Sequence, residues 1–243
     1  MQQYTTLYFI LIFLIVIVYL ITLSSFKNGY PTCNNYVINV YLYLALSLLL
    51  VGLFSYLFEN IITSPSNIFF VVGFLMNIIS LIFIAFSSNF SKNYIYSHVL
   101  WIIFIISFSL IIFPTFEFGR SVIKDAILST SSVFTLFSLI VYLYPSFFKK
   151  TYGFVVPGLF IGLFSIILIH LLNMIVLNNS SINNTLYYVS IMLFSLFVSY
   201  DTSEMFEKAK QCVSFPNYPK SSIDFFLDIF NLFVNFIGIF NGD

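Results

Sequence analysis

Eight stretches of this sequence are apolar and long enough to cross a lipid bilayer, and this feature restricts the fold more than any other. A helix rises about 1.5 Å per residue, so about 20 apolar residues span a hydrocarbon core of roughly 30 Å. Only 7% of the 243 residues are charged, whereas soluble domains carry about 25%. The sequence therefore predicts an all-α membrane protein with almost no chain left for a soluble domain. The predicted spans are 5–23, 36–58, 66–87, 97–114, 120–144, 151–177, 184–200 and 221–240.

The first span, 5–23, has two interpretations. A secretory signal peptide begins with positive charge and ends at a small-residue cleavage site. The residues before this span, MQQY, carry no positive charge, and no clear cleavage site follows it. We therefore expect a retained helix. On this basis the chain divides into 1–35, which holds the extra helix and its cytosolic connection, and a main transmembrane domain over 36–243.

The lysines indicate which ends of the helices face the cytosol. Seven basic residues fall in the first, third, fifth and seventh connections, and the second and sixth connections contain none. The positive-inside rule places the lysine-bearing connections in the cytosol and both termini on the opposite side. These residues are Lys27, Lys92, Lys149, Lys150, Lys208, Lys210 and Lys220. On the opposite side, overlapping glycosylation sequons stand at Asn178, Asn179 and Asn183, although an asparagine-rich chain also produces such matches by chance.

The last span, 221–240, contains two carboxylates in an otherwise apolar segment. At 100° per residue, its strongly polar side chains fall within a wedge of about 60°. A carboxylate near mid-membrane costs about 3 kcal/mol, so this polar stripe should face protein or water. We therefore predict a central helix with its stripe turned inward. The stripe consists of Asp224, Asp228, Asn231 and Asn235.

A third acid, Asp201, ends the preceding predicted span. If the last two spans are antiparallel neighbours and Asp201 is drawn into the bundle, it meets Asp228. Two unit charges about 4 Å apart repel by roughly 4 kcal/mol at an effective dielectric near 20, so such a pair shares one proton and titrates as a unit. This arrangement suits a proton-operated latch or a cation site. In the alternative, Asp201 lies in the headgroup zone beside the solvated Glu204, Glu207 and Lys208.

The other polar candidates each have a structural alternative. Asp125 shares a helix face with three serines and can face the interior, or it can pair with a neighbouring base at the interface. His98 and His170 lack convergent partners, which favours packing over metal or haem ligation. Cys33 and Cys212 fit neither a disulfide framework nor a metal-site spacing. A formal net charge of zero excludes a basic nucleic-acid footprint.

Two motifs in the C-terminal third carry a recognisable pattern. The sequence reads YDT at 200–202 and FLDIFNLF at 226–233. These motifs resemble the YDT-type motif and the YLDxxNLF-type helix that end members of the Bax inhibitor (transmembrane Bax inhibitor motif, Lifeguard) family. Weaker similarities lie at 39–47 and 125–134, so the resemblance covers about 36–243.

The resemblance implies a seven-helix bundle in which six helices surround the last one, to which this chain adds 5–23. It also implies a calcium leak across a membrane and, in eukaryotes, suppression of cell death. Two family aspartates that form a pH-responsive pair and hold the pore closed match Asp201 and Asp228, which we take as gating residues and as calcium ligands. Only Lys92 stands where bacterial relatives carry an arginine cluster. The supporting polar residues are Asp125, which matches the acid that begins the family's fourth helix, Asp224 and Asn231.

Three functions follow as alternatives. The first is a proton-gated calcium leak, with calcium as the transported ion and no cofactor. The second is a non-conducting scaffold that binds membrane cell-death regulators. The third is an intramembrane aspartyl protease, which is disfavoured because its second aspartate follows Gly-x-Gly, whereas Phe226-Leu227 precede Asp228 here. The expected host is the endoplasmic reticulum or another intracellular membrane, with the plasma membrane as the alternative.

Overall fold

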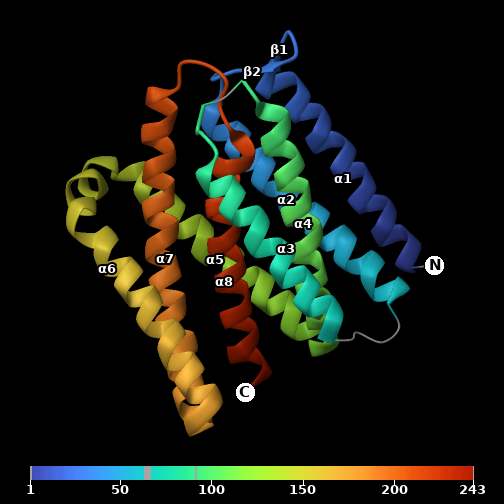
Figure 1. Ribbon diagram of the computed structural model, residues 1–243, viewed down its shortest axis with the longest axis vertical. Coiled ribbons are helices and arrows are strands. Elements are labelled where there is room, and N and C mark those ends of the chain that lie inside the picture. The colour runs from blue at the N-terminus through green and yellow to red at the C-terminus, as the bar shows by residue number, and fades with distance from the viewer. Residues whose placement is uncertain (1, 63–66, 91, 243) are drawn as a thin grey trace. The chain divides into compact units, whose positions relative to one another are not determined.

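A computed structural model describes residues 2–62, 67–90 and 92–242, and nearly all of them are helical (Figure 1). Two two-residue strands, β1 (Phe26–Lys27) and β2 (Tyr30–Pro31), form an antiparallel hairpin. A 3₁₀ segment, η1 (Phe113–Phe118), follows the fourth helix, and a π-helical segment, η2 (Asn173–Leu177), follows the sixth. The helices are α1 (Gln2–Ser25), α2 (Tyr36–Ile61), α3 (Asn67–Phe86), α4 (Tyr94–Ile112), α5 (Arg120–Leu143), α6 (Pro145–Leu172), α7 (Ser180–Gln211) and α8 (Tyr218–Asn241).

All eight helices in the described part of the chain are long and apolar enough to cross a membrane, which confirms the predicted all-α membrane fold. The largest difference from the sequence prediction concerns α7. Its predicted span ends at residue 200, but the helix continues to Gln211. Hydropathy stops at the first charged residues, whereas residues 201–211 are good helix formers whose charged side chains need no apolar surroundings. Asp201 therefore lies well inside a continuous helix.

The chain forms two compact units, and α7 and α8 contribute to both of them. Unit 1 comprises residues 1–117 and 208–226, and unit 2 comprises residues 118–207 and 227–243. The last turn of α7 and the first nine residues of α8 therefore belong to unit 1, and the rest of both helices belongs to unit 2. The predicted division of the chain after residue 35 stays a prediction.

Aromatic side chains hold the first half of α8 in unit 1. The ring of Phe226 meets Phe104 and Phe108 of α4 edge-on, with centroids 5.4 and 4.9 Å apart. Tyr218 stacks on Tyr43 of α2 at 5.6 Å. Edge-to-face and offset pairs of this kind add about 0.5–1.5 kcal/mol each beyond burial. The entry of α8 into unit 1 is thus fixed by ring packing on two neighbouring helices.

The two cysteines form a disulfide, contrary to the prediction from sequence. Cys33 lies in the α1–α2 connection and Cys212 in the α7–α8 connection, with Cα atoms 5.8 Å apart. They are 179 residues apart in the chain, so no spacing pattern indicated the pair. Their proximity arises because the fold of unit 1 brings these two connections to the same end of the helices (Figure 1).

The core of unit 2 forms where α6, α7 and α8 meet. Leu232 of α8 is completely buried with Phe194, Phe197 and Val198 of α7 and with Leu159 of α6. Partly buried side chains of α5, including Phe134 and Phe137, pack against this cluster. These contacts fix the second half of α8 against α7.

Gly238 of α8 leaves room for the ring of Tyr187 from α7. A Cβ atom at residue 238 would lie 2.5 Å from Cζ of Tyr187. We expect Gly238→Ala to destabilise the protein, because overpacking costs about 1–3 kcal/mol and exceeds the roughly 1 kcal/mol that removing a helical glycine returns. Thermal unfolding in detergent micelles measures this as a lower Tm.

Gly158 of α6 provides the matched control. Nothing lies within 4 Å of a Cβ placed there, so Gly158→Ala is expected to leave Tm unchanged or slightly raised. Equal unfolding temperatures for the two alanine variants would contradict the close approach of α7 and α8.

Candidate functional site

The two aspartates of the predicted pair both lie in unit 2. Asp228 is on α8 and only 5% exposed, so it does not face lipid. Asp201 is on α7 and half-buried. The buried position of Asp228 agrees with the inward-facing stripe expected from the sequence. It also means that the carboxylate lies in a region of low dielectric, where its charge interacts strongly with neighbouring groups.

The packing of α7 on α8 sets the relative level of these two residues. The helices are antiparallel (Figure 1), and Val198 and Leu232 are buried in one cluster. Asp201 follows Val198 by three residues along α7, and Asp228 precedes Leu232 by four residues along α8. Since the chains run in opposite directions, both steps lead about one turn, roughly 5 Å, toward the α7–α8 connection. The acids therefore lie at the same level of the helix pair, and direct contact between their carboxylates stays a prediction.

The residues on either side of Asp201 fix α7 within unit 2. Tyr200 packs against the buried cluster around Leu232. The hydroxyl of the fully buried Thr202 donates to the carbonyl oxygen of Val198 (2.7 Å) and lies 3.3 Å from Oγ of Ser138 on α5. Because successive helical residues point about 100° apart, anchoring residues 200 and 202 determines the direction of residue 201. The YDT motif thus acts as a positioning element.

The two asparagines of the stripe bond to their own helix. Nδ2 of Asn231 donates to the carbonyl oxygen of Leu227, and Nδ2 of Asn235 donates to that of Asn231, each at 2.7 Å. Asn235 is buried and Asn231 half-buried. These bonds satisfy the amide donors inside the protein. The stripe next to Asp228 is therefore polar without carrying further charge.

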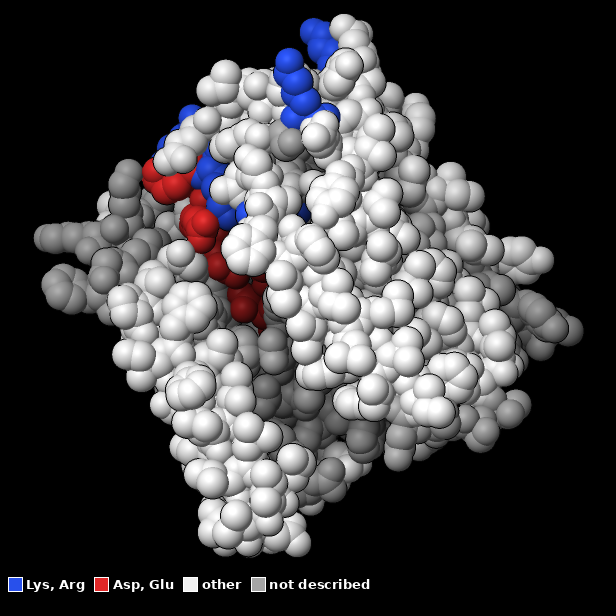
Figure 2. Space-filling view, in the orientation of Figure 1, with Lys and Arg blue, Asp and Glu red and all other residues white. Residues whose placement is uncertain are grey.

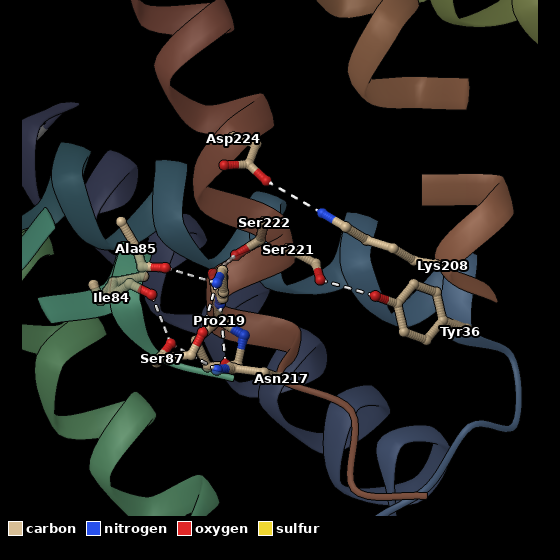
Figure 3. A network of polar contacts seen from close by, with 11 residues as sticks. Tyr36, Ile84, Ala85, Ser87, Lys208, Asn217, Pro219, Ser221, Ser222 and Asp224 are labelled. Carbon is tan, nitrogen blue, oxygen red and sulfur yellow. Dashed lines mark hydrogen bonds and ion pairs between the residues drawn. The ribbon is translucent and has the colours of Figure 1, made fainter. Parts of the chain in front are cut away.

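Asp224, the other acid of the stripe, forms an ion pair with the end of α7. It lies in unit 1, where its Oδ2 is 3.7 Å from Nζ of Lys208, and its side chain is 45% exposed (Figure 3). An exposed pair of this kind contributes at most about 1 kcal/mol. Asp224 therefore joins the end of α7 to the start of α8, and its supporting role toward Asp228 stays a prediction.

The remaining predicted residues lie outside this site. Asp125 is exposed on α5, which favours the interfacial alternative. His98 uses both ring nitrogens for hydrogen bonds, to the Tyr43 hydroxyl and to the Tyr94 carbonyl oxygen, each at 2.7 Å. His170 contacts the ring of Tyr187. Within the described residues, no three His, Cys, Asp or Glu side chains converge as a metal cluster.

The sequence analysis missed a buried polar network at the start of α8. Asn217 precedes the helix, and its Oδ1 accepts a hydrogen bond from the backbone N–H of Lys220 (3.2 Å), as an N-cap does. Its Nδ2 lies 3.0 Å from both the Ser88 carbonyl oxygen and Ser97 Oγ, and 3.2 Å from Ser87 Oγ. An asparagine before a proline-containing first turn is a helix-start signal that could have been found in the sequence.

Ser221 extends this network to Tyr36 of α2 (Figure 3), and Lys220 extends it to the end of α3. Nζ of Lys220 donates to the carbonyl oxygens of Ala85 and Ser87, at 2.9 and 2.6 Å, at the end of α3. Oγ of Ser221 is 2.8 Å from the Tyr36 hydroxyl. The first turn of α8 is thus bound on two sides within unit 1.

Comparison with known proteins agrees with the architecture and with the motifs. The family model described as "Inhibitor of apoptosis-promoting Bax1" matches residues 33–243. No curated protein matches the chain. The family match begins after α1 and the β1–β2 hairpin and includes all of α7 and α8. This multi-pass membrane protein therefore belongs to the apoptosis-related Bax inhibitor family.

Proposed function

We propose that this protein is a proton-gated calcium leak whose gate is the pair Asp201 and Asp228. The observation that carries the proposal is the burial of Asp228 at the level of Asp201 on the adjacent, antiparallel α7. Ionisable residues held within membrane spans usually mark an ion or proton pathway, because their insertion is costly without a function. The leak would act in an intracellular membrane such as the endoplasmic reticulum and modulate cell death by changing stored calcium.

The gate works through one shared proton. With a proton between them, the two carboxylates hydrogen-bond and hold α7 and α8 together. When that proton leaves, two like charges about 4 Å apart repel by roughly 4 kcal/mol. That energy is enough to shift a two-state equilibrium by about a thousandfold. We therefore expect the open state to be favoured as pH rises.

The same loss of a proton prepares the site for a cation. Calcium takes six to eight oxygen ligands, and two carboxylates supply part of that set, with carbonyl groups and water as the remainder. A site with so few protein charges binds weakly, and weak binding suits passage rather than storage. Calcium is thus proposed as the transported ion and not as a resident metal.

Flux measured in liposomes tests this function. The purified chain, reconstituted with a calcium-sensitive dye inside the vesicles, is expected to pass calcium faster than empty vesicles. The rate should rise by about fivefold or more from about pH 6 to about pH 8, because one coupled proton is lost over that interval. Flux equal to that of empty vesicles at every pH would contradict a leak. Co-purification of a stoichiometric cell-death regulator with this inactive protein would then favour the scaffold alternative.

A further inference from the structure

The disulfide lies where the lysines of unit 1 gather. Figure 2 shows basic side chains at one end of the molecule and a nearly charge-free surface over most of the visible face. Lys210 stands two residues before Cys212, and Nζ of Lys92 lies 5.7 Å from the ring centre of Phe215, three residues after it. Lys27 belongs to the hairpin that precedes Cys33. Lysines therefore lie near both connections that the disulfide joins.

The positions of these lysines conflict with a permanent disulfide. The positive-inside rule places this end of the helices in the cytosol, and cytosolic thiols are kept reduced unless they have a redox role. Both cysteines are half-buried, and the neighbouring Asn34 and Val213 are exposed, Val213 to 90%. Because both residues are partly exposed, small-molecule thiols and disulfides have access to the pair, and access is one condition for thiol–disulfide exchange.

We propose that Cys33 and Cys212 are a reversible dithiol–disulfide pair that responds to the redox state of the cytosol. One thiolate attacks a small-molecule disulfide such as glutathione disulfide, which forms a mixed disulfide and releases one glutathione thiol. The second cysteine, as its thiolate, then attacks the protein sulfur of that mixed disulfide and releases the second glutathione. In total the pair gives up two electrons and two protons, and the small-molecule disulfide becomes two thiols. An excess of glutathione reverses both steps.

Non-covalent contacts keep the two cysteines close after reduction. The Tyr218 hydroxyl donates to the carbonyl oxygen of Thr32, the residue before Cys33. The backbone N–H of Asn217 donates to the Asn89 carbonyl oxygen at 2.9 Å, and Phe90 and Pro216 form an isolated bridge. The α1–α2 and α7–α8 connections therefore remain held by hydrogen bonds within unit 1 when the disulfide is reduced. The bond adds a covalent link that can be made and broken while the fold persists.

Oxidation would covalently link the α1–α2 connection, just after the β1–β2 hairpin, to the α7–α8 connection. The hairpin already covers α4, because the Tyr94 hydroxyl donates to the Gly29 carbonyl oxygen at 2.8 Å and Phe26 contacts the rings of Tyr94 and His98. Tyr30 reaches Phe215 in the α7–α8 connection. The redox-sensitive element is thus the hairpin together with residues 211–217. This inference does not depend on calcium conduction.

Thiol labelling of the full chain in cells tests the proposal. Because the chain has only two cysteines, a polyethylene-glycol maleimide added after acid quenching reports their state as a shift in gel mobility. We expect two labels in untreated cells, none after diamide, and two again after dithiothreitol. A membrane-impermeant maleimide should reach the reduced pair from the cytosolic face of sealed vesicles. Hydrogen exchange of residues 211–217 should be about fivefold or more faster in the reduced protein, since a covalent restraint on local opening is lost.

Single serine variants serve as controls. Cys33→Ser and Cys212→Ser should each show one label in untreated cells and after dithiothreitol. After diamide the remaining cysteine should carry a mixed disulfide with glutathione, because no second cysteine is present to resolve it. Two labels after diamide would show that the pair does not form a bond. An absence of label in untreated cells, or labelling only from the non-cytosolic face, would identify a permanent disulfide in an oxidising compartment. Each of these three results overturns the proposal.

Discussion

Replacement of Asp228 by asparagine is expected to abolish the pH dependence of calcium flux. Asparagine has nearly the same shape and can still hydrogen-bond, but it carries no titratable proton and no negative charge. The repulsion of roughly 4 kcal/mol that we propose as the opening force is then lost at every pH. We expect flux in reconstituted liposomes to change by less than about twofold from about pH 6 to about pH 8, where the unmodified chain changes by about fivefold or more.

Three further variants make this result specific. Asp201→Asn should give the same flat profile, and the double variant should be no worse than either single one, because two residues that act as one unit are not additive. Asp224→Asn is the matched control on the same helix, since Asp224 is 45% exposed and pairs with Lys208. It should retain the wild-type profile. A pH profile unchanged in Asp228→Asn, or one lost equally in Asp224→Asn, would remove the aspartate pair as the gate.

The second large effect is expected at the start of α8. Asn217→Ala removes the N-cap of this helix, which costs about 1 kcal/mol. It also removes the Asn217 amide from the buried hydroxyl group of Ser97, from the half-buried hydroxyl group of Ser87 and from the Ser88 carbonyl oxygen. A buried polar group left unmet costs about 1–3 kcal/mol. We expect a total loss of about 2–4 kcal/mol in the free energy of unfolding, measured by denaturant titration in micelles.

One further variant separates the capping contribution of Asn217 from that of its amide donor, and a second variant serves as a control. Asn217→Asp retains the acceptor that caps the helix but loses the amide donor, so it should lie between the wild type and Asn217→Ala. Asn60→Ala is the control because Asn60 is exposed, and its side-chain hydrogen bond among the described residues stays within its own helix, to the Tyr56 carbonyl oxygen. It should cost less than about 0.5 kcal/mol. Similar losses in Asn60→Ala and Asn217→Ala would show that the network around Asn217 contributes little.

Local features of the sequence correctly predicted the helices and the family. Runs of about 20 apolar residues must form helices in a bilayer, because no water is present to satisfy exposed backbone groups. The same reasoning placed the stripe of 221–240 against protein, and Asp228 is buried as expected. The length of α7 was underestimated. Hydropathy shows where the apolar residues of a span end, but a helix can continue beyond that point with charged residues. The YDT and FLDIFNLF motifs identified the family because they are short and contiguous.

Tertiary structure alone decided which residues distant in the chain come together. The disulfide joins residues 179 positions apart, and Asn217 bonds to serines more than 100 residues away. No periodicity records such pairs, because they depend on how helices pack and where connections meet. The register that brings Asp201 level with Asp228 follows from the packing of Leu232 beside Val198. The sequence by itself determined the spans and the acids within them. Packing determined which faces of the helices are buried, because side-chain shape fixes helix register only once the helices are in contact.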